Sequence, residues 1–130
     1  RTADAAGYRL AILMKGTADV YAPKVVRAAT GSLFRMPVVS MASAKELAEF
    51  TGAAGKKLTA TCLDARRWYY DEDLTHDIAL IIGNEGNGIS RDLIESSDIQ
   101  IKIPMQGNIE SLNAAVAAGV LMYEAMRGKR

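Results

Sequence analysis

The stretch 81–88 reads Ile-Ile-Gly-Asn-Glu-Gly-Asn-Gly and marks the place where an apolar run breaks into a glycine-rich turn with one carboxylate. The run begins at Ile78 and is continuous, which is typical of a central parallel strand covered on both faces. Because glycines let the backbone approach a bound molecule closely, the turn is a candidate ligand site that contains Glu85. Taken alone, these glycines also fit a tight structural turn, and Glu85 also fits a surface position.

A second apolar strand downstream is again followed by a turn and then by a helix. The strand ends in Ile-Pro-Met at 103–105, a turn follows at 106–108, and Ser-Leu-Asn at 111–113 opens a helix expected to reach about Met126. The larger apolar residues of this helix are spaced to share one face: Leu112, Val116, Val120 and Tyr123.

The rest of the chain predicts strands that alternate with helices. Further strands are expected at 8–14, 36–41 and 58–62, and further helices at 23–31, 43–52 and 90–96. Ser43 and Glu46 form a capping box at the start of one of these helices, and 64–77 is expected to be a loop with a short helical turn. The alternation predicts one α/β domain over 1–130 with a mainly parallel sheet, whose ligands gather at the carboxyl ends of the strands.

Charge is distributed unevenly along a chain whose net charge is only +1. Residues 1–57 carry nine Lys and Arg against four Asp and Glu, whereas 68–100 carry one Arg against eight acids. The total charge therefore gives no argument for nucleic-acid binding, but the basic half would suit either a phosphate backbone or an ordinary solvated face.

Several classes of site are disfavoured by the residues present. The single Cys62 excludes an intramolecular disulfide and suits a reducing compartment, and with His76 as the only histidine we expect no metal site. No apolar run approaches the roughly 20 residues that span a membrane. The order G-x-x-G-x-G at 83–88 is not the G-x-G-x-x-G of a nicotinamide-binding domain.

Residues 68–70 are Trp-Tyr-Tyr and follow two arginines. These aromatic side chains would either stack on bases or pack as a loop or dimer contact.

The three segments at 83–88, 103–105 and 111–113 together resemble motifs of the SpoU/TrmH-type RNA 2′-O-ribose methyltransferases of the SPOUT superfamily. Upstream, Arg-Thr-Ala-Asp-Ala-Ala-Gly at 1–7 resembles the end of the family's first motif. Residues 24–34 resemble its K-x-x-R-A-S-x-G-A-L-F segment, except that Ala29 and Thr30 depart from the usual residue types. The resemblance covers essentially the whole chain.

This resemblance implies a C-terminal deep trefoil knot whose turns clasp S-adenosylmethionine, with S-adenosylhomocysteine as the product. The cofactor-binding positions that it implies are Gly83, Ile103, Leu112, Thr61 and Met105. The catalytic positions that it implies are Arg1, Glu85, Ser111 and Asn113.

Each catalytic position has an expected role. Arg1 is expected to clamp phosphate and stabilise a developing alkoxide, because a guanidinium is a poor base. Ser111 and Asn113 would orient the reacting groups, although Ser111 also fits a plain N-cap, and Glu85 would orient Arg1 or Asn113.

The implied reaction is methyl transfer to a ribose 2′-hydroxyl of RNA by a cytoplasmic homodimer. Ribosomal RNA is the first expectation, transfer RNA the alternative, and a non-catalytic knotted module for RNA binding or dimerisation a further one. The family's first motif starts with a strand and an Asn ahead of its Arg. Both are absent here, where Arg1 is the first residue. We therefore expect an N-terminally incomplete catalytic domain that lacks its first strand and any RNA-recognition domain.

Overall fold

Two parallel sheets form the framework of the molecule. The structure is a computed structural model and describes residues 1–127 and 129. The smaller sheet pairs β1 (Ala11–Met14) with β2 (Val38–Met41). The larger sheet has the order β4-β6-β3-β5. Its strands are β3 (Lys57–Thr61), β4 (Arg67–Trp68), β5 (Ile78–Ile81) and β6 (Ile99–Lys102). The α/β class with parallel strands is thus confirmed.

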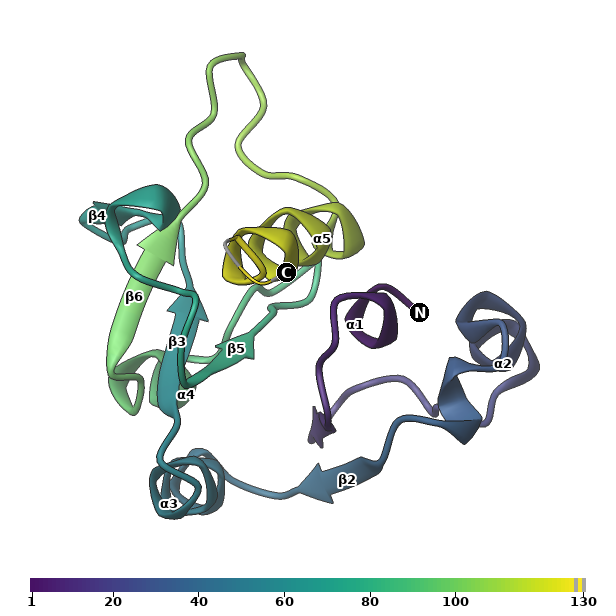
Figure 1. The fold of residues 1–130 in the computed structure, drawn as a ribbon. Helices are drawn as coiled ribbons and strands as arrows, with labels where there is room; N and C mark the ends of the chain where they lie inside the picture. Colours follow the sequence, from purple (N-terminus) through teal and green to yellow (C-terminus); the bar gives the residue numbers. More distant parts are fainter. Residues whose placement is uncertain (128, 130) are drawn as a thin grey trace.

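Helices connect the strands and pack against the sheets (Figure 1). The α-helices are α1 (Thr2–Ala5), α2 (Pro23–Ala29), α3 (Ala44–Ala53), α4 (Arg91–Glu95) and α5 (Ala114–Ala125), and 3-10 turns lie at η1 (Ser32–Phe34) and η2 (Tyr69–Asp71). The capping box is confirmed in part, because the Ser43 hydroxyl accepts the Glu46 N–H at 3.2 Å while the Glu46 carboxylate accepts the Ala42 N–H. The strand β4 was not predicted, because two residues inside a polar segment give no periodic pattern.

The core consists of two apolar clusters on opposite faces of β5. Ile81 belongs to one cluster with residues of β2, α3, β3 and α4, and partly buried Ala79 packs against it. Ile78, Leu80 and Ile82 pack against the other cluster, which includes Leu121 of α5. Burial on both faces explains why the sequence of β5 is a continuous apolar run.

The predicted central position of this strand is wrong for the sheet as described. β5 pairs with β3 alone and forms one edge of the larger sheet, whereas β3 lies between β5 and β6. A continuous apolar run reports that both faces are covered, but it does not report whether both edges are paired.

Candidate functional site

The predicted cofactor residues meet because three neighbouring strands end at the same level. The parallel registers pair Ala60 with Ile81 and Thr61 with Ile101. The carboxyl ends of β3, β5 and β6 therefore lie side by side. The segments that begin at Thr61, Gly83 and Ile103 start at the same edge of the sheet. This is the edge at which ligands bind in open parallel sheets.

The turn after β5 is closed by its own backbone and by Asn84. Asn84 and Gly88 exchange both backbone N–H···O bonds, at 3.1 and 2.9 Å, and the Asn84 side-chain oxygen accepts the N–H groups of Gly86 and Asn87. A Cβ on Gly83 would lie 2.6 Å from the carbonyl carbon of Gly88, so no larger residue fits there. These four hydrogen bonds close the turn, and Glu85 is exposed at its tip.

A side-chain hydrogen bond joins this turn to the start of α5. The Asn113 amide nitrogen donates to the Glu85 carboxylate, across 28 residues of sequence. The Asn113 side-chain oxygen accepts the N–H groups of Ala115 and Val116 at 3.0 and 3.2 Å, so Asn113 is the N-cap of α5. One amide therefore both begins a helix and orients a carboxylate.

The helix starts three residues later than predicted, and Ser111 is not its cap. Ser111 is exposed on the preceding loop, and its side chain makes no hydrogen bond to the described residues. The structure thus brings Glu85 and Asn113 together but leaves Ser111 in the segment beside them.

The segment between β6 and α5 extends away from the body of the molecule (Figure 1). Ile103 packs against the core cluster beneath it, and Met105 is half-buried, whereas Leu112 is 37% exposed. Residues 105–112 make no backbone–backbone hydrogen bond to any described residue. Their N–H and C=O groups are therefore available to a ligand, and the apolar side chains of Ile103, Met105 and Leu112 lie in the same segment.

Arg1 is placed by α1, a helix that packs beside α5 (Figure 1). It precedes α1 and lines a hollow of about 270 Å³ together with Asp4, Ala5, Thr30, Ser32 and Arg35. No hydrogen bond within the described chain joins the Arg1 side chain to the other three predicted catalytic residues. Arg1 is exposed and free to reach a molecule that spans both regions.

An ion pair beside Arg1 was not predicted. Two nitrogens of Arg35 donate to one Asp4 carboxylate oxygen, at 2.6 and 3.1 Å, and the same guanidinium reaches the Ser32 hydroxyl. Hydrogen bonding by Ser32, and then by Arg35, lowers the pKa of the Asp4 carboxyl. The separation of 31 residues hides this pair from the sequence.

Within the described part of the chain, no helix is long and apolar enough to cross a membrane. Three side chains of the His, Cys, Asp or Glu type do not come together there as metal ligands. The groups that the candidate site offers to a ligand are therefore an arginine, a carboxylate, an amide and unpaired backbone N–H and C=O groups.

Comparison with known proteins gives the same result for sequence and for fold. The SpoU rRNA Methylase family matches residues 1–123. The 23S rRNA (guanosine(2553)-2'-O)-methyltransferase RlmP of Bacillus subtilis is 41% identical over 128 residues, which are 98% of this chain and 51% of the relative. A 23S rRNA (uridine(2479)-2'-O)-methyltransferase of Streptomyces viridochromogenes is 40% identical over 132 residues, covering 98% of this chain and 46% of the relative.

Among solved structures, the AdoMet-bound rRNA methyltransferase of Sinorhizobium meliloti matches with a TM-score of 0.92 and 34% identity, over 100% of this chain and 50% of that one. The chain thus spans about half the length of the curated relatives it matches. The match over residues 1–123 shows that the chain belongs to the SpoU rRNA Methylase family.

Proposed function

We propose that this chain is the catalytic domain of an enzyme that transfers a methyl group from S-adenosylmethionine to a ribose 2′-hydroxyl of ribosomal RNA. The observation that carries the proposal is the Glu85–Asn113 bond, which ties two turns together where β3, β5 and β6 end. Relatives named as 23S rRNA 2'-O-methyltransferases support ribosomal RNA as the substrate.

The residues at this edge fit S-adenosylmethionine. Ile103, Met105 and Leu112 offer apolar surface for an adenine ring, and the unpaired backbone of 105–112 offers donors and acceptors for its edge. Thr61 lies at the same level, with its hydroxyl donating to the Ile81 carbonyl at 3.2 Å. The cofactor, when bound, supplies an electrophilic methyl group on its sulfonium.

The chain's own residues position the ribose and stabilise charge. Asn113 holds the Glu85 side chain in one arrangement, so the carboxylate can be presented to the 2′-hydroxyl at no further ordering cost. Arg1 donates to an RNA phosphate and stabilises the alkoxide that develops as the hydroxyl loses its proton. Because Arg1 and the Glu85–Asn113 pair are not in contact, the RNA itself would bridge them.

Two measurements test the proposal. Calorimetric titration of the chain is expected to show saturable binding of S-adenosylmethionine and none of NADH, with binding lost in Leu112→Glu. Ribosomal RNA incubated with the chain and cofactor is expected to yield 2′-O-methylated nucleosides by mass spectrometry. Binding without methylation of either ribosomal or transfer RNA would favour the non-catalytic RNA-binding module instead.

The knot and a further strand belong to the same proposal. β6 lies between β4 and β3, and the segment 103–113 then leads to α5, which packs back over the larger sheet. This course is compatible with threading as a deep trefoil knot. We also propose that a strand of the longer protein lies between β5 and β1, both of which are sheet edges.

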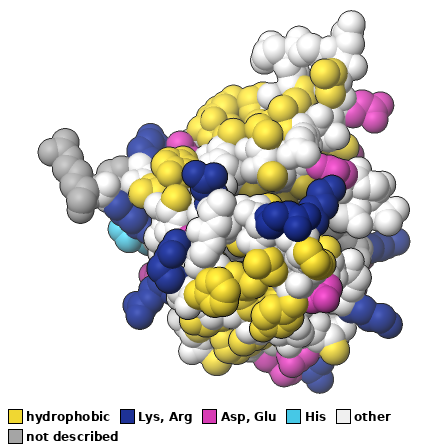
Figure 2. Space-filling model, turned by 90° about the vertical axis from the view of Figure 1, so that its right-hand side faces the viewer, with side chains coloured by type: hydrophobic (Ala, Val, Ile, Leu, Met, Phe, Trp, Pro, Cys, Tyr) yellow, Lys and Arg dark blue, Asp and Glu magenta, His cyan; other side chains and the backbone are white. Residues whose placement is uncertain are grey.

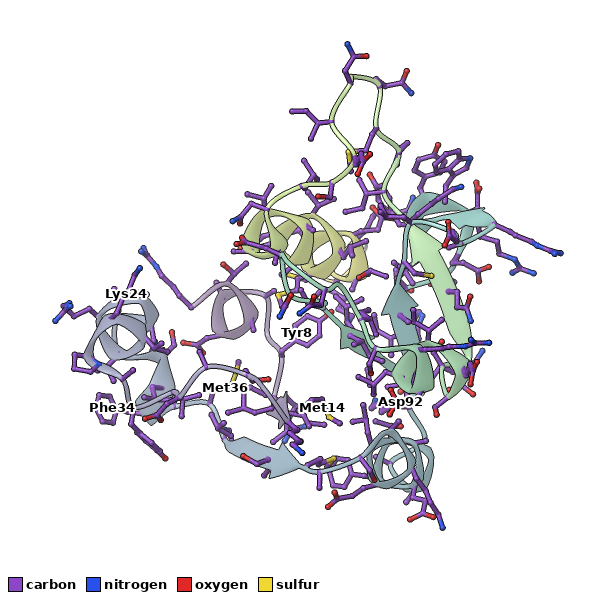
Figure 3. All side chains as sticks on the ribbon, turned by 180° about the vertical axis from the view of Figure 1, so that it is seen from behind. Tyr8, Met14, Lys24, Phe34, Met36 and Asp92 are labelled. Carbon is purple, nitrogen blue, oxygen red and sulfur yellow. The ribbon has the colours of Figure 1, made fainter. Side chains whose placement is uncertain are left out.

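Tyr8 supports the position of this additional strand. Its hydroxyl is buried and lacks a hydrogen-bond partner among the described residues, and burial raises the pKa of the phenol. Figure 3 shows the ring pointing from the α1–β1 connection toward the larger sheet. A paired strand there would offer backbone groups to the hydroxyl, and β5 amides should then exchange hydrogen more slowly in a version extended ahead of Arg1.

An apolar face on α5 supports a homodimer. Val116, Val120 and Tyr123 of the predicted face lie on α5, whereas Leu112 precedes the helix; these four side chains are 37–54% exposed rather than buried. An apolar stripe without charges suits packing against its own copy about a two-fold axis. Val116→Glu is expected to convert a dimer into a monomer in sedimentation equilibrium; an unchanged mass would refute this interface.

Cytoplasmic localisation is proposed on the same basis, because the proposed substrate is ribosomal RNA.

A further inference from the structure

The outer side of α2 and η1 carries exposed aromatic side chains that nothing in the structure covers. Phe34 is 85% exposed and Tyr21 is 74% exposed. Figure 3 shows Phe34 and Lys24 on the same side of the molecule, both pointing away from its body. We refer to Tyr21, Lys24, Arg27, Phe34 and Arg35 as the α2–η1 face.

The charge of this face is positive. Lys24 and Arg27 are exposed on α2, and neither forms an ion pair with a described residue. Two carboxylates are bonded to members of the cluster: Asp4 accepts from Arg35, and Asp19 accepts the backbone N–H of Tyr21. Figure 2, which views this side, shows Lys and Arg side chains lying among hydrophobic ones.

The α2–η1 face continues into the hollow at Arg1. Thr30 and Ser32, which join α2 to η1, line that hollow together with Asp4, Arg1 and Arg35. Thr30 has a left-handed backbone (φ 45°), and the adjacent Gly31 has φ 85°, so the chain reverses sharply and presents η1 beside Arg1. A polymer that reaches Arg1 from this side would pass Arg35, which lines the hollow and follows Phe34 in the sequence.

We propose that the α2–η1 face binds a single-stranded segment of the substrate RNA, with Phe34 stacking on an unpaired base and Lys24 and Arg27 contacting phosphates. The proposal rests on the proposed function, because it specifies how the substrate reaches Arg1. A surface that combines cations with exposed aromatic rings has the chemistry that binds single strands without base pairing. Contact with a second copy about a two-fold axis would bring the cations of this face against one another, which is unfavourable.

The test measures binding of a fluorescein-labelled single-stranded RNA of about 12 nucleotides by anisotropy over a salt series. Phe34→Ala is expected to weaken binding about tenfold, because one stacked base is lost. Lys24→Gln with Arg27→Gln is expected to reduce the slope of log Kd against log salt by about 1.4, since two phosphate contacts are removed. A duplex of the same sequence should be insensitive to Phe34→Ala.

Matched controls lie on α3. Phe50 is 44% exposed there and Lys45 is also exposed, so Phe50→Ala and Lys45→Gln change the same residue types on another surface. Control variants that weaken binding as much as the α2–η1 variants would overturn the proposal, as would a Phe34→Ala variant with unchanged RNA affinity. A change of oligomeric state in Phe34→Ala would assign the face to a dimer contact and also overturn it.

Cofactor titration separates this proposal from the proposed function. All of these variants should bind S-adenosylmethionine as the parent does, because none lies at the ends of β3, β5 and β6. A parent chain that does not bind S-adenosylmethionine would instead refute the proposed function.

Discussion

Two regions of the molecule bear the proposed chemistry, and they are built differently. At the ends of β3, β5 and β6, glycine turns and free backbone surround a single amide–carboxylate bond. Around α1, α2 and η1, Arg35 lines a hollow together with Arg1, and Lys24 and Arg27 are exposed on α2. The first region is suited to reading the edges of a small molecule, and the second to a polyanion. In the proposed function, the first region holds the cofactor and the reacting ribose, and the second holds phosphates of the RNA.

The largest expected effect lies in the first region. Asn113→Ser keeps an oxygen that can cap α5 but loses the amide donor to Glu85. Methyl transfer is expected to fall by about 100-fold or more, while the free energy of unfolding changes by less than about 1 kcal/mol. Single-turnover methylation and urea unfolding measure the two quantities. Glu85→Gln, which can still accept this bond, is the companion variant, and a fully active Asn113→Ser would show that the bond is purely structural.

The next effect concerns the glycine turn. In Gly83→Ala the new methyl group would meet the Gly88 backbone at 2.6 Å, which cannot move aside as a flexible side chain would. We expect a loss of about 1–3 kcal/mol in the free energy of unfolding and weakened binding of S-adenosylmethionine. Gly107→Ala is the control for the free energy of unfolding, because a Cβ there meets open space. Equal effects of the two substitutions would contradict a packing role specific to Gly83.

The smallest expected effect concerns the second region and is the pH dependence of the stability that the Asp4–Arg35 ion pair contributes. Because the pKa of the folded Asp4 carboxyl is lowered from its ordinary value of 3.8, its contribution to stability is present above that value and is lost as pH falls through the lowered pKa. The difference in unfolding free energy between the parent and Asp4→Asn should therefore be constant near neutrality and shrink below about pH 4. Urea unfolding across this range measures it, and a difference independent of pH would exclude the ion pair as its cause.

Much of the framework was predictable from local pattern. The apolar run before Gly83, the capping box at Ser43 and the Pro23 start of α2 each report an element through its own few residues. Parallel topology then followed from the alternation of strands and helices. Sequence pattern was less accurate at the ends of elements, and it placed the start of α5 three residues early because Ser111 and Asn113 are both good caps.

The amino-acid sequence by itself determined the α/β class, the glycine turn, the shared apolar face of α5 and the family, because these depend on periodicity and on motifs of neighbouring residues. Only the tertiary structure decided that β5 is an edge strand and that the face of α5 is exposed. It also decided that Asn113 contacts Glu85 and that Arg35 pairs with Asp4, since these contacts depend on strand order and on distances between residues far apart in the chain.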